Sequence, residues 1–233
     1  MTELYQHLNL QGQAFRGIKS GQFPVGKVVC VGRNYMDHIK ELGNEVSELP
    51  ILFMKPASAL VDINQGITLP KHAGECHNEL ELAFLIGEKL SNASEQECAD
   101  AIVGVALALD LTLRDLQNQL KKAGQPWERA KAFDGSCPIS GFMPIAQFEE
   151  PQFEFTLHVN GELRQHGNSQ LMLHKVLPLV ANISKTFTLM PGDIVLTGTP
   201  KGVAALHTGD SIDAELVGHF AIHTQVDQQV SGA

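Results

Sequence analysis

The chain has 233 residues, of which 43% are hydrophobic and 18% charged, and its formal net charge is −9. This length and apolar content suffice for a substantial core in one large domain or two small ones. The negative charge argues against a nucleic-acid partner, because no general basic field would gather phosphates. A small anion can still bind where a metal or a few local cations supply positive charge.

Neither the start of the chain nor its apolar runs indicate export or a membrane span. The first residues, MTELYQHLNLQGQ, lack the basic start and apolar stretch of a signal peptide. The longest apolar runs, such as AIVGVALAL, are too short to cross a bilayer. Cys30, Cys76, Cys98 and Cys137 are scattered without a CxxC pair. They indicate reduced thiols in a cytoplasmic protein and argue against a zinc site built on cysteine.

The first half of the chain alternates strands with short helices. KVVCVG, residues 27–32, predicts a buried strand that enters a loop, and MDHIKEL predicts a short helix stopped by Gly43. ILFMKP predicts an apolar strand ended by Pro56. NELELAFLIG, residues 78–87, predicts a strand with a half-exposed entrance, because polar and apolar residues alternate there, and a buried remainder.

The next segment predicts a helix followed by a strand. Ser94 and Glu97 have the spacing of a capping box, and the apolar run after them ends at Asp110. LRDLQNQLKKAG then has the leucine spacing of a helix closed by Gly124.

The second half is mostly strands. FEFTLHV and ELRQHG flank an Asn160-Gly161 pair of the kind that closes tight hairpins. A helix is expected from about Ser169 to Lys185, disturbed by Pro178. GDIVLTGTP, GDSIDAELVG and FAIHTQV predict three further strands, the first two entered through Gly-Asp turns. Short strands predominate, so a curled sheet with helices packed outside is favoured over a doubly wound parallel sheet.

Three acidic residues form the first candidate site. Glu79 and Glu81 are two apart, so on a strand they project from the same face, together with His77. Asp110, at the end of another apolar run, would bring a third carboxylate to a sheet edge. Three oxygen ligands on strands suit Mg²⁺ or Mn²⁺ better than zinc. The alternative is an amphipathic strand with two solvated glutamates, since Glu-x-Glu arises often by chance.

Three weaker patterns accompany the acidic set. His38 and Glu41 are three apart, so on a helix they share a face and could form a general base for water, or an ordinary exposed pair. LTGTPKGV presents the hydroxyls of Thr197 and Thr199 in a loop that could approach a carboxylate, or simply turn tightly. Lys131, in ERAKAFDGSCP, is a lone lysine of the kind that is usually solvated.

In this order the segments resemble the fumarylacetoacetate hydrolase family, and most closely its short branch of acylpyruvases and oxaloacetate decarboxylases. The resemblance runs from Lys27 to the last strand. Its matching pieces are VCVGRNYMDHIKELG, LFMKP, HNELELAFLIG, ALDLTLRDLQ, PWERAKAFDGSCP, VNGELRQ and GDIVLTGTPKGV.

The resemblance implies an α+β, mainly β fold: a mixed β-sheet roll of the fumarylacetoacetate hydrolase C-terminal-domain type with outer helices. It implies a single domain, in which residues 27–233 form the catalytic domain and residues 1–26 an N-terminal extension packed on it. It also implies a homodimer. A cytoplasmic location, with no nucleic-acid or membrane partner, agrees with the composition.

The resemblance also assigns roles to residues. Glu79, Glu81 and Asp110 match the family's metal ligands, for Mg²⁺ or alternatively Mn²⁺. The matching catalytic residues are the pair on a mobile lid helix and a lysine that polarises a substrate oxygen, namely His38, Glu41 and Lys131. The positions that line the substrate pocket are Arg33, Arg114, Gln117 and Thr199.

The expected activity is a divalent-metal-dependent C–C bond hydrolase or decarboxylase acting on small 2-oxo acids, such as acylpyruvates and oxaloacetate, through a metal-stabilised enolate. In hydrolysis, His38 assisted by Glu41 would deprotonate the attacking water. The alternatives are an isomerase, decarboxylase or hydratase-type enzyme of aromatic catabolism acting on hydroxymuconate-type or 2-oxo-heptenedioate substrates, and an oxaloacetate keto–enol tautomerase. A binding protein that has lost catalysis is a further alternative.

Overall fold

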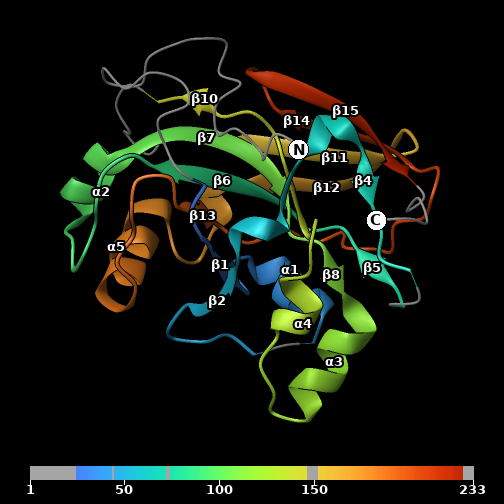
Figure 1. Ribbon diagram of the computed structural model, residues 1–233, viewed down its shortest axis with the longest axis horizontal. Coiled ribbons are helices and arrows are strands. Elements are labelled where there is room, and N and C mark those ends of the chain that lie inside the picture. The colour runs from blue at the N-terminus through green and yellow to red at the C-terminus, as the bar shows by residue number, and fades with distance from the viewer. Residues whose placement is uncertain (1–24, 44, 72–73, 146–151, 228–233) are drawn as a thin grey trace.

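The computed structural model describes residues 25–43, 45–71, 74–145 and 152–227 (Figure 1). The expected N-terminal extension, residues 1–26, therefore lies almost entirely outside the described residues.

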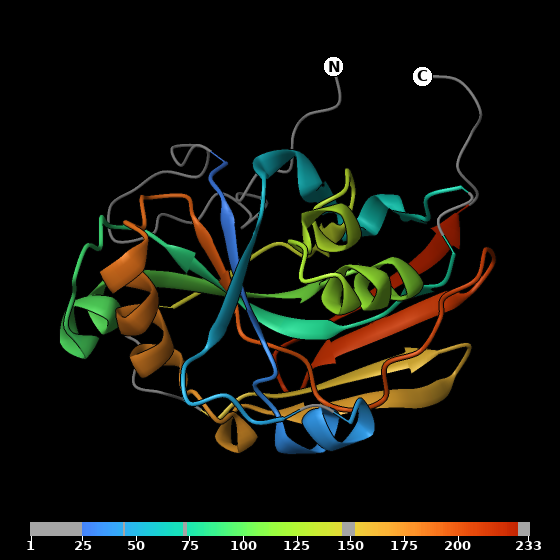
Figure 2. The same ribbon diagram turned by 90° about the horizontal axis from the view of Figure 1, so that it is seen from below.

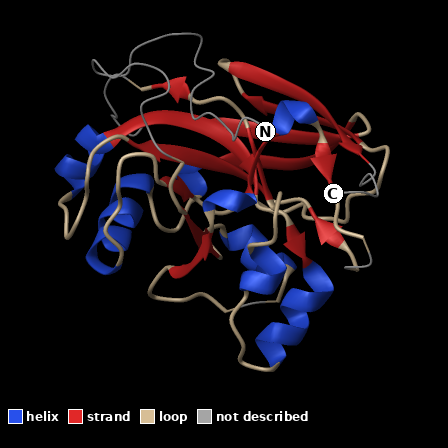
Figure 3. Ribbon diagram, in the orientation of Figure 1, coloured by secondary structure: helices blue, strands red, loops and turns tan. Residues whose placement is uncertain are grey.

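Short strands make up most of the regular structure (Figure 3). The strands are β1 (Val28–Gly32), β2 (Ile51–Lys55), β3 (Leu60–Asp62), β4 (Ile67–Thr68), β5 (Cys76–His77), β6 (Leu80–Ile86), β7 (Ile102–Leu109), β8 (Thr112–Leu113), β9 (Cys137–Ile139), β10 (Met143–Pro144), β11 (Glu154–Val159), β12 (Glu162–Asn168), β13 (Ile194–Leu196), β14 (Ser211–Leu216) and β15 (Phe220–Asp227). The helices are α1 (Met36–Glu41), α2 (Glu95–Ala101), α3 (Arg114–Lys122), α4 (Glu128–Lys131) and α5 (Val176–Thr186), with short 3₁₀ turns η1 (Ala57–Ala59), η2 (Ile63–Gln65) and η3 (Ser169–Leu171).

The strands form two main sheets. The larger has the order β2-β1-β13-β6-β7-β9-β3, with β10 paired to β7, and the smaller has the order β12-β11-β14-β15-β4. β1–β13 and β3–β9 are parallel in the larger sheet, and its other pairs are antiparallel. Helices α2 and α5 lie together at one end of the molecule, at the left in both views, whereas α3 and α4 lie together nearer its middle (Figures 1 and 2). The predicted mainly β fold, a mixed curled sheet with outer helices, is confirmed.

The local sequence signals explain where several elements begin and end. Ser94 caps α2 through a capping box with Glu97, as predicted. Asn160 and Gly161 both have positive φ, 54° and 79°, which a tight hairpin turn between β11 and β12 requires. Gly43, with φ of 61°, lies just after the C-cap of α1, where a left-handed residue ends a helix.

Two expectations about elements are wrong. The helix expected over residues 169–185 is instead η3 followed by α5, which begins only at Val176. Pro178 then falls in the first turn of α5, where backbone N–H groups have no partner within the helix, so it disturbs nothing. The entrance to β6 is not half exposed, because Glu79 and Glu81 are both buried.

The centre of the larger sheet is the most deeply buried part of the chain. Every residue of β6 and of β7 is buried. The four cysteines are free thiols, and all are buried. Among the described residues, no helix is both long and apolar enough to span a bilayer.

Candidate active site

Three carboxylates meet where β6 begins and β7 ends. Glu79 directly precedes β6, Glu81 is its second residue, and Asp110 directly follows β7. The two strands are antiparallel with Leu80 opposite Leu109, and the Asp110 amide donates a hydrogen bond to the Glu79 carbonyl at 2.8 Å. The start of one strand therefore lies beside the end of the other. One oxygen from each carboxylate lies within 4.8 Å of the others. Glu79, Glu81 and Asp110 are called the acidic triad below. His77, expected on the same face, is not part of this group and pairs with Glu75.

Cations from distant segments pair with two of the three carboxylates. The Lys131 ammonium lies between Glu79 Oε2, at 2.8 Å, and Asp110 Oδ2, at 2.6 Å. Arg114 also pairs with Glu79, and Lys55 Nζ lies 2.8 Å from Asp110 Oδ1. Burial would raise the pKa of Glu79, but Lys131 and Arg114 outweigh it and hold that pKa well below its usual range.

Glu81 differs from its two neighbours. Only 1% of it is exposed, and among the described residues no side-chain cation forms an ion pair with it. Its Oε2 accepts one hydrogen bond, from the Gly198 amide at 2.6 Å. Burial, and then the charges of Asp110 and Glu79, raise the pKa of Glu81 well above its usual value. A buried carboxylate of this kind calls for a further cation.

The acidic triad fits a divalent metal ion. Its donors are hard oxygens on rigid strand ends, the type preferred by Mg²⁺ and Mn²⁺, and it includes a carboxylate that no described cation neutralises. Glu79, Glu81 and Asp110 would hold the ion. Lys131 already bridges two of them, so it would share these ligands with a metal.

His38 and Glu41 form a pair on α1. His38 Nδ1 lies 3.1 Å from Glu41 Oε2, and Glu41 Oε1 accepts a hydrogen bond from the Gly202 amide at 2.9 Å. An ionised carboxylate can only accept, so Nδ1 carries the proton in this pair and Nε2 keeps a free lone pair. The imidazole is buried and lines the same pocket as the acidic triad. A histidine and a carboxylate cluster able to hold a metal ion therefore face one cavity.

The pocket collects most of the residues assigned from the sequence. It is lined by Val31, Gly32, Arg33, His38, Leu42, Phe53, Glu79, Glu81, Asp110, Gln117, Lys121, Trp127, Lys131 and Thr199. Two assigned residues are not part of this lining but contact residues that are: Arg114 contacts Glu79 and Gln117, and Glu41 contacts His38.

Two of the assigned residues already use their polar atoms within the protein. The Lys131 ammonium donates to Glu79, Asp110 and Thr112, which accounts for its three N–H groups. The Thr199 hydroxyl donates to the Leu80 carbonyl at 2.8 Å, and the Thr197 hydroxyl to the Leu82 carbonyl at 3.2 Å. The loop after β13 is therefore hydrogen-bonded to β6 through these two threonine side chains.

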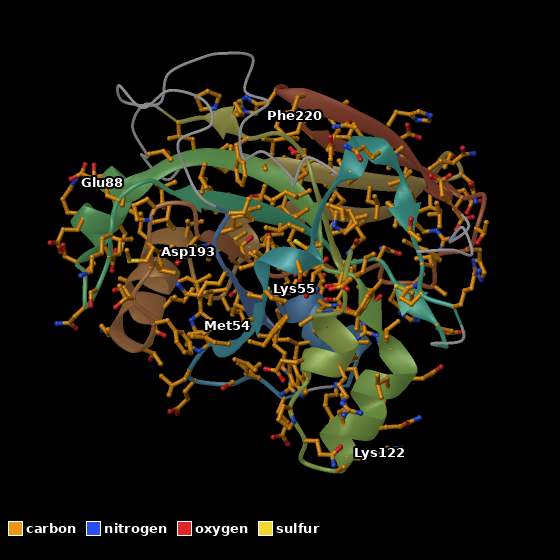
Figure 4. The ribbon with its side chains drawn as sticks, in the orientation of Figure 1. Met54, Lys55, Glu88, Lys122, Asp193 and Phe220 are labelled. Atoms are coloured by element: carbon orange, nitrogen blue, oxygen red, sulfur yellow. The ribbon has the colours of Figure 1, made fainter. Side chains whose placement is uncertain are left out.

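Sequence reasoning missed Lys55 and Lys121. Lys55, the last residue of β2, is fully buried in the interior of the molecule (Figure 4). Besides Asp110, its Nζ contacts the Lys131 carbonyl and, at 3.0 Å, the Ser136 carbonyl. A lysine closing an apolar strand is the signal that could have identified it, because such a residue needs buried partners. Lys121 lines the pocket from α3.

One protein family and several known proteins are similar to this chain over most of its length. The family described as "Fumarylacetoacetate (FAA) hydrolase C-terminal" matches residues 27–227. Oxaloacetate tautomerase YcgM of Escherichia coli (strain K12) is 53% identical over 218 residues, which are 93% of this chain and 97% of the relative.

Two solved structures are also similar. A fumarylacetoacetate hydrolase family protein from Yersinia pestis CO92 superposes with a TM-score of 0.86 at 52% identity, covering 92% of this chain and 98% of its own. Fumarylpyruvate hydrolase from Pseudomonas aeruginosa, solved in complex with Mn²⁺ and pyruvate, has a TM-score of 0.84 at 36% identity, covering 89% of this chain and 91% of its own.

Proposed function

The chain belongs to the fumarylacetoacetate hydrolase family, and we propose that it is a divalent-metal-dependent enzyme whose main reaction is the keto–enol tautomerisation of oxaloacetate. The observation that carries the proposal is the acidic triad, three buried carboxylates around one point in a pocket that also holds a histidine base. The 53% identity to an oxaloacetate tautomerase over nearly the whole chain supports the choice of reaction. When bound, a divalent ion would supply a Lewis acid that polarises the 2-oxo group.

The chain's own residues would move one proton. Tautomerisation takes a proton from carbon 3 of the keto form and places one on the 2-oxo oxygen. His38 Nε2 is the free base of the pair, and Glu41 stabilises the imidazolium that forms. The same imidazole returns the proton to the oxygen, so the site gains and loses no net proton. Lys131 remains an ammonium, because Asp110 and Glu79 raise its pKa against the effect of burial.

A second candidate is hydrolysis of acylpyruvates together with decarboxylation of oxaloacetate. The observation that favours it is the His38–Glu41 hydrogen bond, since such a pair can also deprotonate water. The hydroxide formed would add to the distal carbonyl of an acylpyruvate. The C–C bond would then break to give pyruvate and a carboxylic acid. A hydroxymuconate-type isomerase reaction needs no activated water, so the capacity of the pair to deprotonate water does not favour it.

Parallel assays test the proposal. Purified protein loaded with Mg²⁺ or Mn²⁺ is given the enol form of oxaloacetate, and loss of enol absorbance is followed alongside pyruvate release; acetylpyruvate is assayed for cleavage. We expect the highest kcat/KM for tautomerisation and its loss on chelation. A higher kcat/KM for cleavage or decarboxylation would favour the second candidate, and no turnover of any of these acids would refute both.

A further inference from the structure

One face of helix α3 carries a row of polar residues that begins at the acidic triad and continues along the pocket. Arg114, Gln117 and Lys121 are spaced three and four residues apart, which places them on one face of the helix. Arg114 reaches Glu79, so its end of α3 lies at the acidic triad. Lys121 is seven residues further on, about 10 Å along the helix axis, and it also lines the pocket. The row therefore runs from Arg114 at the acidic triad to a second cation, Lys121, further along the pocket.

Arg33 lines the same pocket as Lys121. It lies between β1 and α1, with φ of 61°, in the left-handed region that residues other than glycine seldom adopt. The pKa of Lys121 is lowered, first by burial and then by the charges of Arg33 and Arg114. The three cations thus lie close enough to repel one another.

Two of these cations, Arg33 and Lys121, form no ion pair with a carboxylate within the described part of the chain. Arg114 has Glu79, but the Arg33 guanidinium donates a hydrogen bond of 3.2 Å to the Glu45 carbonyl. Lys121 forms no ion pair with any described residue. Half-buried positive charges without anions lose hydration and gain nothing in return, so they favour an anionic ligand.

We propose that Lys121 and Arg33 bind the carboxylate at the far end of a 2-oxo dicarboxylic acid, and that they make this protein prefer dicarboxylic to monocarboxylic 2-oxo acids. The inference rests on the proposed function, in which the 2-oxo end of the acid lies at the acidic triad. Lys121 is the specificity determinant that neither the motifs nor the relatives assign. An acid that ends in a methyl group would leave both cations without a partner.

A matched pair of ligands tests this inference without requiring turnover. 2-Oxoglutarate and 2-oxopentanoate have the same chain length, but the second carries a methyl group in place of the distal carboxylate. Calorimetric titration of the Mg²⁺-loaded protein gives both dissociation constants. Quenching of Trp127, the only tryptophan and part of the pocket lining, locates the binding. We expect the wild-type protein to bind the dicarboxylate at least about tenfold more tightly.

Variants at two lysines of α3 test whether the preference for the dicarboxylic acid depends on Lys121. Lys121→Met should reduce the preference to less than about threefold, and Lys121→Arg should keep most of it. Lys122→Met is the control, because Lys122 is the exposed neighbour at the outer end of the same helix (Figure 4). It should retain the wild-type preference.

The failures of the two proposals are distinguishable. If the wild-type protein binds both acids equally, or if Lys121→Met weakens both equally, the inference is wrong while the proposed function can stand. If the dicarboxylate preference is present and depends on Lys121 but no 2-oxo acid is turned over, the proposed function is wrong and the inference stands. Absence of binding of both acids refutes both.

Discussion

At the scale of single residues, Glu81 combines deep burial with a charge that no described cation pairs with. Replacing it by glutamine removes the charge but keeps an oxygen for the Gly198 amide. We expect Glu81→Gln to stabilise the metal-free protein at neutral pH by about 1–3 kcal/mol, because on folding the wild-type carboxyl group must either bury its charge or take up a proton, and glutamine does neither. The same variant should lose the rise in melting temperature that Mg²⁺ gives the wild-type protein through binding to the folded state.

Thermal melts in chelator and across a Mg²⁺ titration measure both effects. Glu215→Gln, which changes an exposed glutamate of β14, is the control and should behave like wild type. A Mg²⁺-induced shift that survives in Glu81→Gln would show that Glu81 is not a ligand.

His38 allows the two candidate reactions to be separated. His38→Ala should lower acylpyruvate hydrolysis by about 10²–10⁴-fold, since water loses its base, yet spare much of the decarboxylation, which needs no attacking water. Tautomerisation should fall as well, because His38 moves the proton in the proposed mechanism. Steady-state kinetics on the three reactions give the comparison, with His166→Ala, an exposed histidine of β12, as the control. Equal loss of hydrolysis and decarboxylation would show that the imidazole does more than activate water.

The spacing of Glu79 and Glu81 and the strand end at Asp110 made these three residues a candidate site, and the family resemblance then assigned them together as metal ligands. Their burial could not be predicted. Alternating polar and apolar residues are typical of a strand with one exposed face, and that pattern predicted a half-exposed entrance. The cations that make burial tolerable, Lys55 and Lys131, lie far away in the sequence. The sequence offered only a lysine that closes an apolar strand for Lys55 and the family resemblance for Lys131, and neither indicated that these lysines pair with the carboxylates.

At the scale of elements, the loop after β13 contacts α1, the helix that carries His38 and Glu41. The Gly202 amide donates to Glu41 Oε1, and Lys201 Nζ lies 3.4 Å from Asp37 Oδ2 on the same helix. Gly202 has φ of 99°, and an added Cβ would lie 1.8 Å from the Arg164 carbonyl oxygen. Only glycine fits at this position, so the loop conformation and the orientation of Glu41 depend on it.

Gly202→Ala tests this dependence against a matched glycine. Gly209 has a similar φ, 93°, but an added Cβ there meets nothing within 4 Å. Gly209→Ala should therefore cost only the left-handed backbone strain, about 1–2 kcal/mol. Gly202→Ala should cost about 4 kcal/mol or more, because a backbone clash is added. Denaturant unfolding compares the two. Equal costs would show that the loop shifts freely and does not fix Glu41.

Helix α5 shows what proline alone can and cannot predict. Pro178 indicates an interrupted helix only if the helix begins well before it, and the start expected from the sequence was about Ser169. In the structure, residues 169–171 form η3 and α5 begins at Val176, so the proline occupies the first turn that suits it. The presence of a helix was predicted correctly, but its first residue depends on how the preceding chain packs against Asn34, which donates to the His174 carbonyl.

At the scale of the whole molecule, one buried glutamine joins the two sheets. Gln165 lies on β12 of the smaller sheet, and its Oε1 accepts from the Leu80 amide of β6 and from Asn78 Nδ2, both at 2.9 Å. Its Nε2 donates to Thr199 Oγ1 at 2.7 Å and to the Pro200 carbonyl at 2.9 Å. All its hydrogen-bonding groups are thus engaged at the point where β6 begins, beside Glu79.

The short strands predicted a curled sheet, but the sequence did not predict that Gln165 connects the two sheets. Leu163 and Gln165 are two apart, so strict alternation would place them on one face, and hydropathy would bury the leucine. The register between β11 and β12 shifts at Leu157 and His158, and the result is the reverse: Leu163 is exposed and Gln165 is buried. Which residue enters the core therefore depends on an irregularity in strand pairing.

Gln165→Leu should consequently affect both stability and metal binding. Leucine has a similar size but leaves the Leu80 amide and the Pro200 carbonyl without partners in the interior, which should cost about 3 kcal/mol or more. Because β6 carries the acidic triad's glutamates, we also expect weaker Mg²⁺ binding at temperatures where the variant is still folded. Calorimetry well below the melting temperature measures that affinity, and Gln225→Leu, at an exposed position of β15, is the control. A destabilised Gln165→Leu that binds Mg²⁺ as tightly as wild type would show that the two sheets hold together without Gln165 positioning the triad.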